Sequence, residues 1–224
     1  MSEQTIIVQE KTTAAEIVKQ GVAKEEAIAQ EAADEATAIK TDCENELAKA
    51  LPALAKATKA LDAISTGDVA EMKGNRSPLP AVVLVMTTVA ILFDIPPESK
   101  MDPTTQKKVQ NYWPPVQKFM GQMGFLDQIK SFNKDLLDEA KINKLQPYIT
   151  QEMFNPEKLQ TVNKVAANFA VWVLAMDGYY RVNLIVIPKR EELKVAQAKY
   201  DKISGELKIA QAKLKKVQDE VAEL

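Results

Sequence analysis

An unbroken heptad pattern over residues 189–224 constrains the fold more than any other feature of this chain. Apolar side chains recur there at alternating spacings of three and four residues, between Lys, Glu and Gln. That period is typical of a coiled coil, and a long helix with one apolar stripe needs a partner helix to bury it. The positions in the stripe are Leu193, Ala196, Tyr200, Ile203, Leu207, Ala210, Leu214, Val217, Val221 and Leu224.

Residues 3–66 predict the partner helix, because helix formers dominate them and apolar or small side chains recur every three or four residues. The steps from Cys43 to Leu47 and from Leu47 to Leu51 are two fours in a row, and such a phase shift locally unwinds a coiled coil. Pro52 lies in this shifted stretch, where it removes a backbone donor. We therefore predict a bend in the helix at Pro52.

Two long helices that flank one domain run antiparallel if their near ends meet at that domain. We predict an all-α fold, a long antiparallel coiled-coil hairpin capped by a small globular bundle of about six helices. The predicted domains are an outgoing helix over 1–66, a helical domain over 67–187 and a returning helix over 188–224. Pro188 suits the first turn of the returning helix. We expect the heptads to reach back to roughly Ala32, as in a piece cut from a longer coiled coil.

The sequence between the two long helices predicts a domain of short helices separated by turns and prolines. We expect a turn-rich break over 67–80, a buried helix over 81–93, an amphipathic helix over 103–120 bent at Pro114, a loop over 146–156 and the longest inner helix over 159–181. No segment alternates with period two for long, so no sheet is expected. The β-branched run over 182–187 would have no strand to pair with.

The absence of histidine and the single cysteine, Cys43, exclude most metal and catalytic sites. Zinc sites, Ser-His-Asp triads and Cys-His pairs need residues that the sequence lacks. No glycine-rich phosphate loop occurs, and adjacent acids such as Glu25 and Glu26 are typical of solvated helix faces. We expect no catalytic site, no cofactor and no metal. One cysteine forms no internal disulfide, which indicates a reducing compartment.

The charge and hydropathy of the sequence limit the kinds of partner that the chain could bind. The net charge of −2 gives no indication of nucleic acid. Residues 1–75 hold 14 acids and 8 bases, whereas residues 76–188 hold 12 bases and 10 acids. A mildly basic domain in an acidic chain suits an acidic partner surface. The longest apolar run, Ala81–Phe93, is too short to span a bilayer, so we expect no membrane.

Five motifs make the chain resemble the stalk and microtubule-binding domain of dynein heavy chains. In order they are similar to the distal outgoing stalk helix with its proline, the start of the first helix of the binding domain, the tryptophan-bearing segment, the last helix of that domain and the start of the returning helix. The segments are ELAKALPALAKATKAL (46–61), EMKGNRSPLPAVVLVM (71–86), NYWPPVQKFM with FLDQIKSFNKD (111–135), LQPYI with FNPEKLQTVNKVAANFAVWV (145–173) and IPKREEL (187–193). Each motif is weak alone, but five in order, at the spacing of the family and between two coiled-coil arms, make a strong resemblance, and the layout is similar over essentially the whole chain.

The resemblance implies the tip of a dynein motor. In dyneins this domain binds the microtubule at the boundary between α- and β-tubulin, and sliding of one stalk helix against the other switches its affinity. The phase shift near Pro52 is a place for that sliding. The implied partners are the microtubule and the rest of the heavy chain, whose ring hydrolyses ATP. Departures from the cytoplasmic pattern favour an axonemal dynein, located in a cilium or flagellum.

The resemblance also implies a set of microtubule contacts. Glu71 and Lys73 fall where the family has a charged pair, and Lys164 falls on a basic position in the last helix of the binding domain. Three further residues, Arg76, Lys118 and Arg181, are included because they are basic and near the implied contact elements.

Several family charges are missing from this sequence. Thr66 and Val83 stand where we expect lysines, Thr87 where we expect a glutamate, and Thr161 where we expect a base. Fewer charges facing the filament predict weaker or more salt-sensitive binding.

A second class of function fits part of the sequence. A coiled-coil scaffold or chaperone-like arm, with a helical domain that binds another protein, would also show the heptads. It does not explain the five ordered motifs, and cosedimentation with microtubules separates the two hypotheses.

Overall fold

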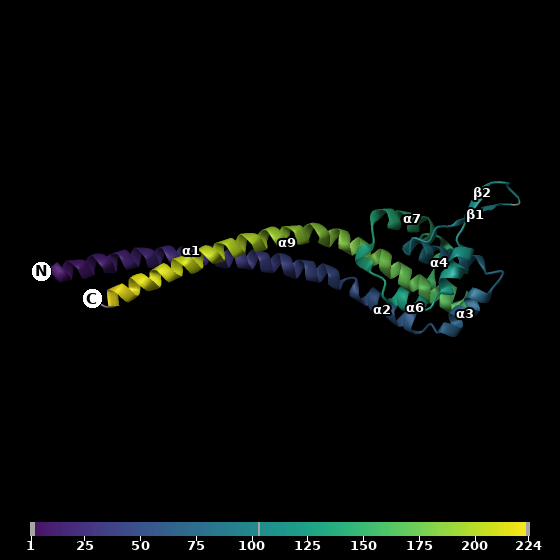
Figure 1. The fold of residues 1–224 in the computed structure, drawn as a ribbon, viewed down its shortest axis with the longest axis horizontal. Helices are drawn as coiled ribbons and strands as arrows, with labels where there is room; N and C mark the ends of the chain where they lie inside the picture. Colours follow the sequence, from purple (N-terminus) through teal and green to yellow (C-terminus); the bar gives the residue numbers. More distant parts are fainter. Residues whose placement is uncertain (1–2, 103, 223–224) are drawn as a thin grey trace. The chain divides into compact units, whose positions relative to one another are not determined.

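The computed structural model describes residues 3–102 and 104–222, so Pro103 and the last heptad position, Leu224, lie outside the described residues. The fold is mainly helical, as predicted (Figure 1). The elements are α1 (Glu3–Ala48), α2 (Leu51–Asp62), α3 (Thr66–Gly74), α4 (Pro80–Leu92), β1 (Glu98–Met101), β2 (Lys108–Asn111), α5 (Trp113–Met120), α6 (Phe125–Lys130), η1 (Lys134–Leu136), α7 (Glu139–Ile149), η2 (Glu152–Phe154), α8 (Pro156–Val162) and α9 (Lys164–Ala222), where η marks a 3-10 helix.

The chain divides into two compact units, which we call the coiled coil (Met1–Glu46 with Ile185–Leu224) and the head (Leu47–Leu184). In the coiled coil, α1 and α9 lie side by side and run antiparallel (Figure 1). The buried residues along the two helices are mostly small or β-branched: Val22, Ala29, Ala32, Ala36 and Cys43 on α1, and Val186 and Ala196 on α9.

Polar contacts between the two helices show the register of the coiled coil. The Nζ atom of Lys189 is 2.6 Å from Asp42 Oδ2, and the Nζ atom of Lys199 is 2.8 Å from Glu35 Oε2. Gln211 donates a hydrogen bond to Glu26 at 2.8 Å. The expectation that pairing stops near Ala32 is wrong, because α9 meets α1 near residue 42 rather than at the end of the outgoing arm.

Pro52 and Pro188 do not occupy the helix positions that the sequence analysis predicted. The outgoing arm is one helix only to Ala48; a turn follows, and α2 begins at Leu51 with Pro52 in its first turn. The predicted helix start at Pro188 is wrong, because α9 continues through it from Lys164. A proline leaves the carbonyl four residues earlier without its helical donor. Leu184, which carries that carbonyl, is 51% exposed, so water can satisfy the group.

The head is built around the first part of α9 and the apolar helix α4. Phe169, Val173 and Leu92 are inaccessible to solvent, and the Phe125 ring meets that of Phe169 edge-on with centroids 6.0 Å apart. The remaining aromatic contacts join loops and helices from separate parts of the sequence: Phe93 with Phe119, Phe132 and Trp172, Phe119 with Phe125, and Phe132 with Trp172. These contacts pack the short elements of the head around one hydrophobic core.

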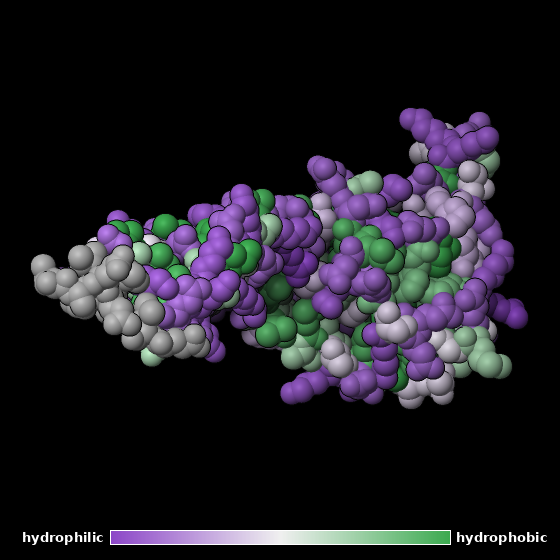
Figure 2. Space-filling view, turned by 60° about the vertical axis from the view of Figure 1, so that its left-hand side comes forward, coloured by the Kyte–Doolittle hydropathy of each residue, from purple (hydrophilic) through white to green (hydrophobic). Residues whose placement is uncertain are grey.

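The expectation of no sheet is wrong, because β1 and β2 form an antiparallel hairpin in which Lys100 pairs with Val109. Its side chains are almost all exposed, and Figure 2 shows it as a mostly hydrophilic projection from the head. Asp102 closes the turn, since its Oδ1 accepts hydrogen bonds from the amides of Thr104 and Thr105. The apolar alternation that predicts strands is absent from a hairpin that buries neither face.

Other boundaries in the head also differ from the prediction. The segment predicted as a break at 67–80 contains α3, and α7 runs to Ile149 with Pro147 inside it. The expected helix over 103–120 is β2 followed by α5, which begins at Trp113 with prolines in its first turn. In α3 and α7 local capping or tertiary packing outweighs the proline and glycine signals, whereas in α5 the prolines mark the start of the helix.

Among the described helices, α9 alone has the length and composition to cross a bilayer. The apolar stretch near its start includes Phe169, Trp172 and Val173, which are buried in the head. A core helix of that kind passes the same test of length and composition.

Candidate functional site

Helix α3 carries two of the predicted contact residues, Glu71 and Lys73, both exposed. A capping box fixes the start of the helix: the amide of Asp68 donates to Ser65 Oγ at 3.1 Å, and the amide of Ser65 donates to Asp68 Oδ2 at 2.8 Å. Hydrogen bonds from the Ser65 side chain and main chain hold the pKa of Asp68 below its ordinary value. The cap sets the direction in which α3 presents its charged side chains.

The end of α3 is fixed by α5. The Nε2 atom of Gln117 donates to the carbonyl oxygen of Lys73 at 2.8 Å. A Cβ atom at Gly121 would lie 3.2 Å from Lys73 Nζ, so the ammonium group sits against the C-terminal end of α5. That end carries partial negative charge, which favours a cation. The backbone of Lys73 is therefore held by Gln117, and its exposed ammonium group lies beside this helix end.

Arg76 and Lys118 are two further predicted bases, one in the loop after α3 and one on α5. Arg76 is exposed in the loop between α3 and α4. Lys118, on α5, forms a 3.0 Å ion pair with Glu98 at the base of the hairpin. The Lys118 side chain is 77% exposed, so this pair is solvated and weak.

Lys164 is the first residue of α9 and is exposed. Asn163 caps the helix, since its Oδ1 accepts a hydrogen bond from the amide of Ala166 at 2.8 Å. The first turn of α9 contains no acidic residue. A cation at a helix N-terminus has the unfavourable sign for the helix dipole, so the charge of Lys164 does not stabilise the helix that carries it.

Arg181 belongs to a different part of the head. Its Nε atom is 2.8 Å from Asp177 Oδ2, and its Nη2 atom donates to Gln146 Oε1 at 3.1 Å. The hydrogen bond with Asp177 raises the pKa of Arg181. Arg181 also lies about 26 Å beyond Lys164 along the helix axis, at 1.5 Å per residue. This network joins α7 to α9 and does not adjoin α3.

The structure thus places Glu71 and Lys73 on α3, Arg76 in the following loop and Lys118 on α5, which contacts the end of α3 through Gln117. Lys164 stands at the start of α9, with no interaction to these residues recorded within the described part of the chain. The hairpin adds three exposed bases that the sequence analysis did not single out, Lys100, Lys107 and Lys108. The sequence analysis could have identified these three bases as one cluster only if it had also predicted the hairpin.

The missing family charges can also be located. Thr87 is buried, and its Oγ1 donates to the carbonyl oxygen of Val83 one turn earlier at 2.8 Å. Thr161 is exposed on α8 and bonds the carbonyl oxygen of Lys158. Thr66 is exposed at the first position of α3. At positions 87 and 161 the threonine hydroxyl donates its hydrogen bond to a carbonyl oxygen of its own helix. Threonine is uncharged, so neither position offers a charge to a partner.

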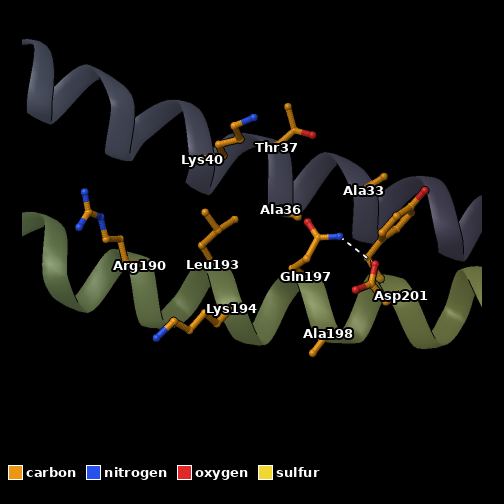
Figure 3. Close-up of a pocket in the computed structure, with 11 residues that line it drawn as sticks. Ala33, Ala36, Thr37, Lys40, Arg190, Leu193, Lys194, Gln197, Ala198 and Asp201 are labelled. Carbon is orange, nitrogen blue, oxygen red and sulfur yellow. Dashed lines mark hydrogen bonds between the residues drawn. The ribbon is translucent and has the colours of Figure 1, made fainter.

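A groove of about 780 Å³ runs between α1 and α9 within the coiled coil (Figure 3). Its α1 side is formed by small residues such as Ala33 and Ala36, whereas α9 contributes Leu193 and Tyr200. Asp201 accepts a hydrogen bond from Gln197 of the same helix at 2.9 Å. Small side chains interlock little with a facing helix, so this stretch of the coiled coil specifies its register weakly.

No cluster of His, Cys, Asp and Glu suited to a metal ion occurs among residues 3–102 and 104–222. What the geometry offers is a solvated array of cations on short, rigidly packed helices, attached to a two-helix coiled coil. This combination defines a class of protein, a coiled-coil stalk with a helical binding head.

Comparison with known proteins names the family. Residues 4–224 match the family model described as the microtubule-binding stalk of dynein motor, and the chain belongs to this family. It is 33% identical over 192 residues to dynein axonemal heavy chain 3 of Mus musculus, covering 85% of this chain. It is 34% identical over 197 residues to the dynein gamma chain of the flagellar outer arm of Chlamydomonas reinhardtii, covering 86% of this chain.

A solved structure agrees with this assignment. The microtubule-binding domain of dynein-c is 32% identical in sequence and superposes with a TM-score of 0.56, covering 67% of this chain and 97% of that one. The chain spans only about 5% of the length of the mouse heavy chain and 4% of that of the Chlamydomonas chain.

Proposed function

We propose that this chain is the microtubule-binding tip of an axonemal dynein heavy chain and acts in the axoneme of a cilium or flagellum. The observation that carries the proposal is the family match over residues 4–224. Axonemal and flagellar relatives support the location. The remainder of the heavy chain would supply ATP hydrolysis and be the second partner, while this segment would bind the filament without catalysing a reaction.

The proposed contact surface consists of Glu71, Lys73, Arg76 and Lys118, with Lys164 as a further contact. Fixed backbones support this assignment, since Gln117 holds Lys73 and Asn163 caps the helix that begins at Lys164. Each exposed ion pair with a filament contributes about 0–1 kcal/mol, so several must act together. Arg181 is assigned to the internal network with Asp177 and Gln146.

We further propose that sliding of α1 against α9 controls the affinity of the head. The helix break before Pro52 and the small residues along α1 support a register that changes at low cost. The polar contacts recorded across the two helices in the present register are made by Lys189, Lys199 and Gln211 of α9. Pro188 would not act as a hinge, because the helix continues through it.

The first experiment is cosedimentation of the whole chain with microtubules over a salt series. Binding that weakens as salt rises is the expected result, since exposed charges are screened over about 10 Å at 0.1 M salt. The missing charges at positions 66, 83, 87 and 161 predict lower affinity and a changed salt slope relative to a head that keeps them. Equal affinity and slope would contradict that part of the proposal.

A chain that stays in the supernatant at low salt would favour the alternative, a scaffold or chaperone-like arm. A disulfide that locks α1 and α9 in a shifted register separates this from a weak-binding state of a dynein stalk. Pelleting restored by the locked register would support the dynein function, whereas absence of binding in both registers would overturn it.

A further inference from the structure

The loop between α3 and α4 contains a serine followed directly by proline, Ser77 and Pro78. It is the one Ser-Pro or Thr-Pro pair in the sequence. Arg76 and Ser77 are exposed, and the Ser77 amide donates to Asn75 Oδ1 at 3.0 Å. Within the described part of the chain, the Ser77 hydroxyl has no recorded hydrogen-bond partner.

The residues on either side of this serine are extended, since Asn75 has φ −71° and ψ 113° and Leu79 has φ −64° and ψ 143°. The chain bends at Arg76 and Ser77 between them. Proline disfavours the helical region for the residue before it, which keeps Ser77 out of both neighbouring helices. Protein kinases bind their acceptor residue in an extended segment, so this exposed bend would open when a kinase binds it. Kinases of the proline-directed class also require a proline directly after the acceptor residue. Proline has no backbone N–H that would need a hydrogen-bond partner.

We propose that Ser77 is an acceptor for a proline-directed protein kinase and that its phosphorylation weakens microtubule binding. The Ser77 Oγ atom attacks the γ-phosphorus of ATP, and an O–P bond forms as the bond to the β–γ bridging oxygen breaks. ADP leaves, and the hydroxyl proton passes to the catalytic base of the kinase. The effect on binding rests on the proposed function of α3 and the loop that follows.

Charge explains the expected effect. A phosphoserine carries about −1.5 to −2 at neutral pH and accepts strong hydrogen bonds from arginine. Its neighbour Arg76 would pair with the phosphate and be withdrawn from a filament. The new anion would also stand four residues after Lys73, whose ammonium group lies beside the end of α5. A basic contact surface would thereby lose cations and gain repulsion toward an acidic partner.

The test is incubation of the full chain with ATP and a mitogen-activated protein kinase, followed by mass spectrometry and microtubule cosedimentation. We expect one phosphoryl group on Ser77, lost in Ser77→Ala and in Pro78→Ala and kept in the control Ser99→Ala. The phosphorylated chain should bind microtubules about two- to tenfold more weakly at low salt, with the difference shrinking as salt rises. Ser77→Asp should reproduce part of the loss.

The two readouts fail separately. No incorporation at Ser77 into a chain that binds microtubules would overturn the acceptor site. Incorporation with unchanged affinity would overturn the regulatory effect. Failure of the unmodified chain to pellet in either locked register would overturn the proposed function, and the effect on binding with it, while the mass measurement would still decide the acceptor site.

Discussion

The side chain of Gln117 donates a hydrogen bond to the carbonyl oxygen of Lys73, joining α5 to the last turn of α3 across 44 residues of sequence. The same Nε2 atom lies 3.5 Å from the carbonyl oxygen of Asn75. One neutral side chain thus holds the backbone from which Lys73 and Arg76 extend. A residue outside the charged set consequently controls the geometry of that set.

Substitution of Gln117 tests this control. Gln117→Ala should reduce microtubule affinity several-fold while lowering stability by only about 1 kcal/mol, the usual net value of one hydrogen bond. Cosedimentation and thermal melting measure the two effects. The matched control is Gln151→Ala, which removes a side-chain bond to the carbonyl oxygen of Pro147 in the same head. Equal affinities of the two variants would show that Gln117 does not position α3.

The capping box of α3 should give the head a specific pH dependence. Because the folded-state pKa of Asp68 is lowered, its contribution to stability is present above the ordinary aspartate pKa and is lost as pH falls through the lowered value. The wild type should therefore melt at a higher temperature than Asp68→Asn at neutral pH. The two melting curves should converge in acid, and a difference independent of pH would contradict this account.

Reversing the charge of Lys164, at the start of α9, should weaken microtubule binding more than removing the charge does. Lys164→Ala removes one attraction, whereas Lys164→Glu adds repulsion from an acidic filament, so the glutamate variant should bind microtubules more weakly. Neither change should lower the melting temperature, because a cation at this helix end is not stabilising and an acid there is favoured. Unchanged affinity of Lys164→Glu would remove this residue from the contact surface.

The ion pair between Lys189 and Asp42 provides a test of register. The Asp42 carboxylate raises the pKa of Lys189, so the ammonium form is favoured throughout the neutral range. Lys189→Glu should lower the melting temperature of the coiled coil, and the double variant with Asp42→Lys should recover part of the loss. Lys194→Glu is the control, since Lys194 pairs with Glu191 on its own helix. No recovery in the double variant would argue against a register contact.

Substitutions in the core of the head should lower stability as they do in a tightly packed protein interior. Phe169 is inaccessible to solvent and contacts the Phe125 ring, so Phe169→Ala should cost about 3–5 kcal/mol in the free energy of unfolding. Phe169→Leu should cost less, because most of the volume is kept. Chemical denaturation of the two variants measures the difference. A cost below about 1 kcal/mol for the alanine variant would be inconsistent with this packing.

Periodicity predicted the long helices because one apolar stripe per helix is a strong and local signal. The heptads after Pro188 are paired as expected, and the phase shift after Cys43 precedes the break between α1 and α2. The start of α9 was predicted wrongly because a proline was given more weight than the helical residues on both sides of it. Leu184, whose carbonyl loses its helical donor, is an exposed residue, and exposure is not visible in sequence.

The candidate site was predictable only as a set of residue types. Motif resemblance indicated Lys73 and Lys164, but nothing local distinguishes Arg181, which is bound to Asp177, from a solvated base. The hairpin bases were missed for the same reason as the hairpin itself. Its two strands are held by backbone pairing, and their side chains carry no alternation that a sequence pattern could detect.

A hairpin that buries neither face has a consequence for how sequences of this kind diverge. Most core positions of the head are coupled to neighbours, so a change at Phe169 requires compensation elsewhere. Exposed positions such as Lys100 or Val109 carry no such coupling, and exchanges there cost the fold little. Substitutions can accumulate on this projection while the helical body stays the same. Evolution can thereby alter the surface chemistry of one member of a family without redesigning its architecture.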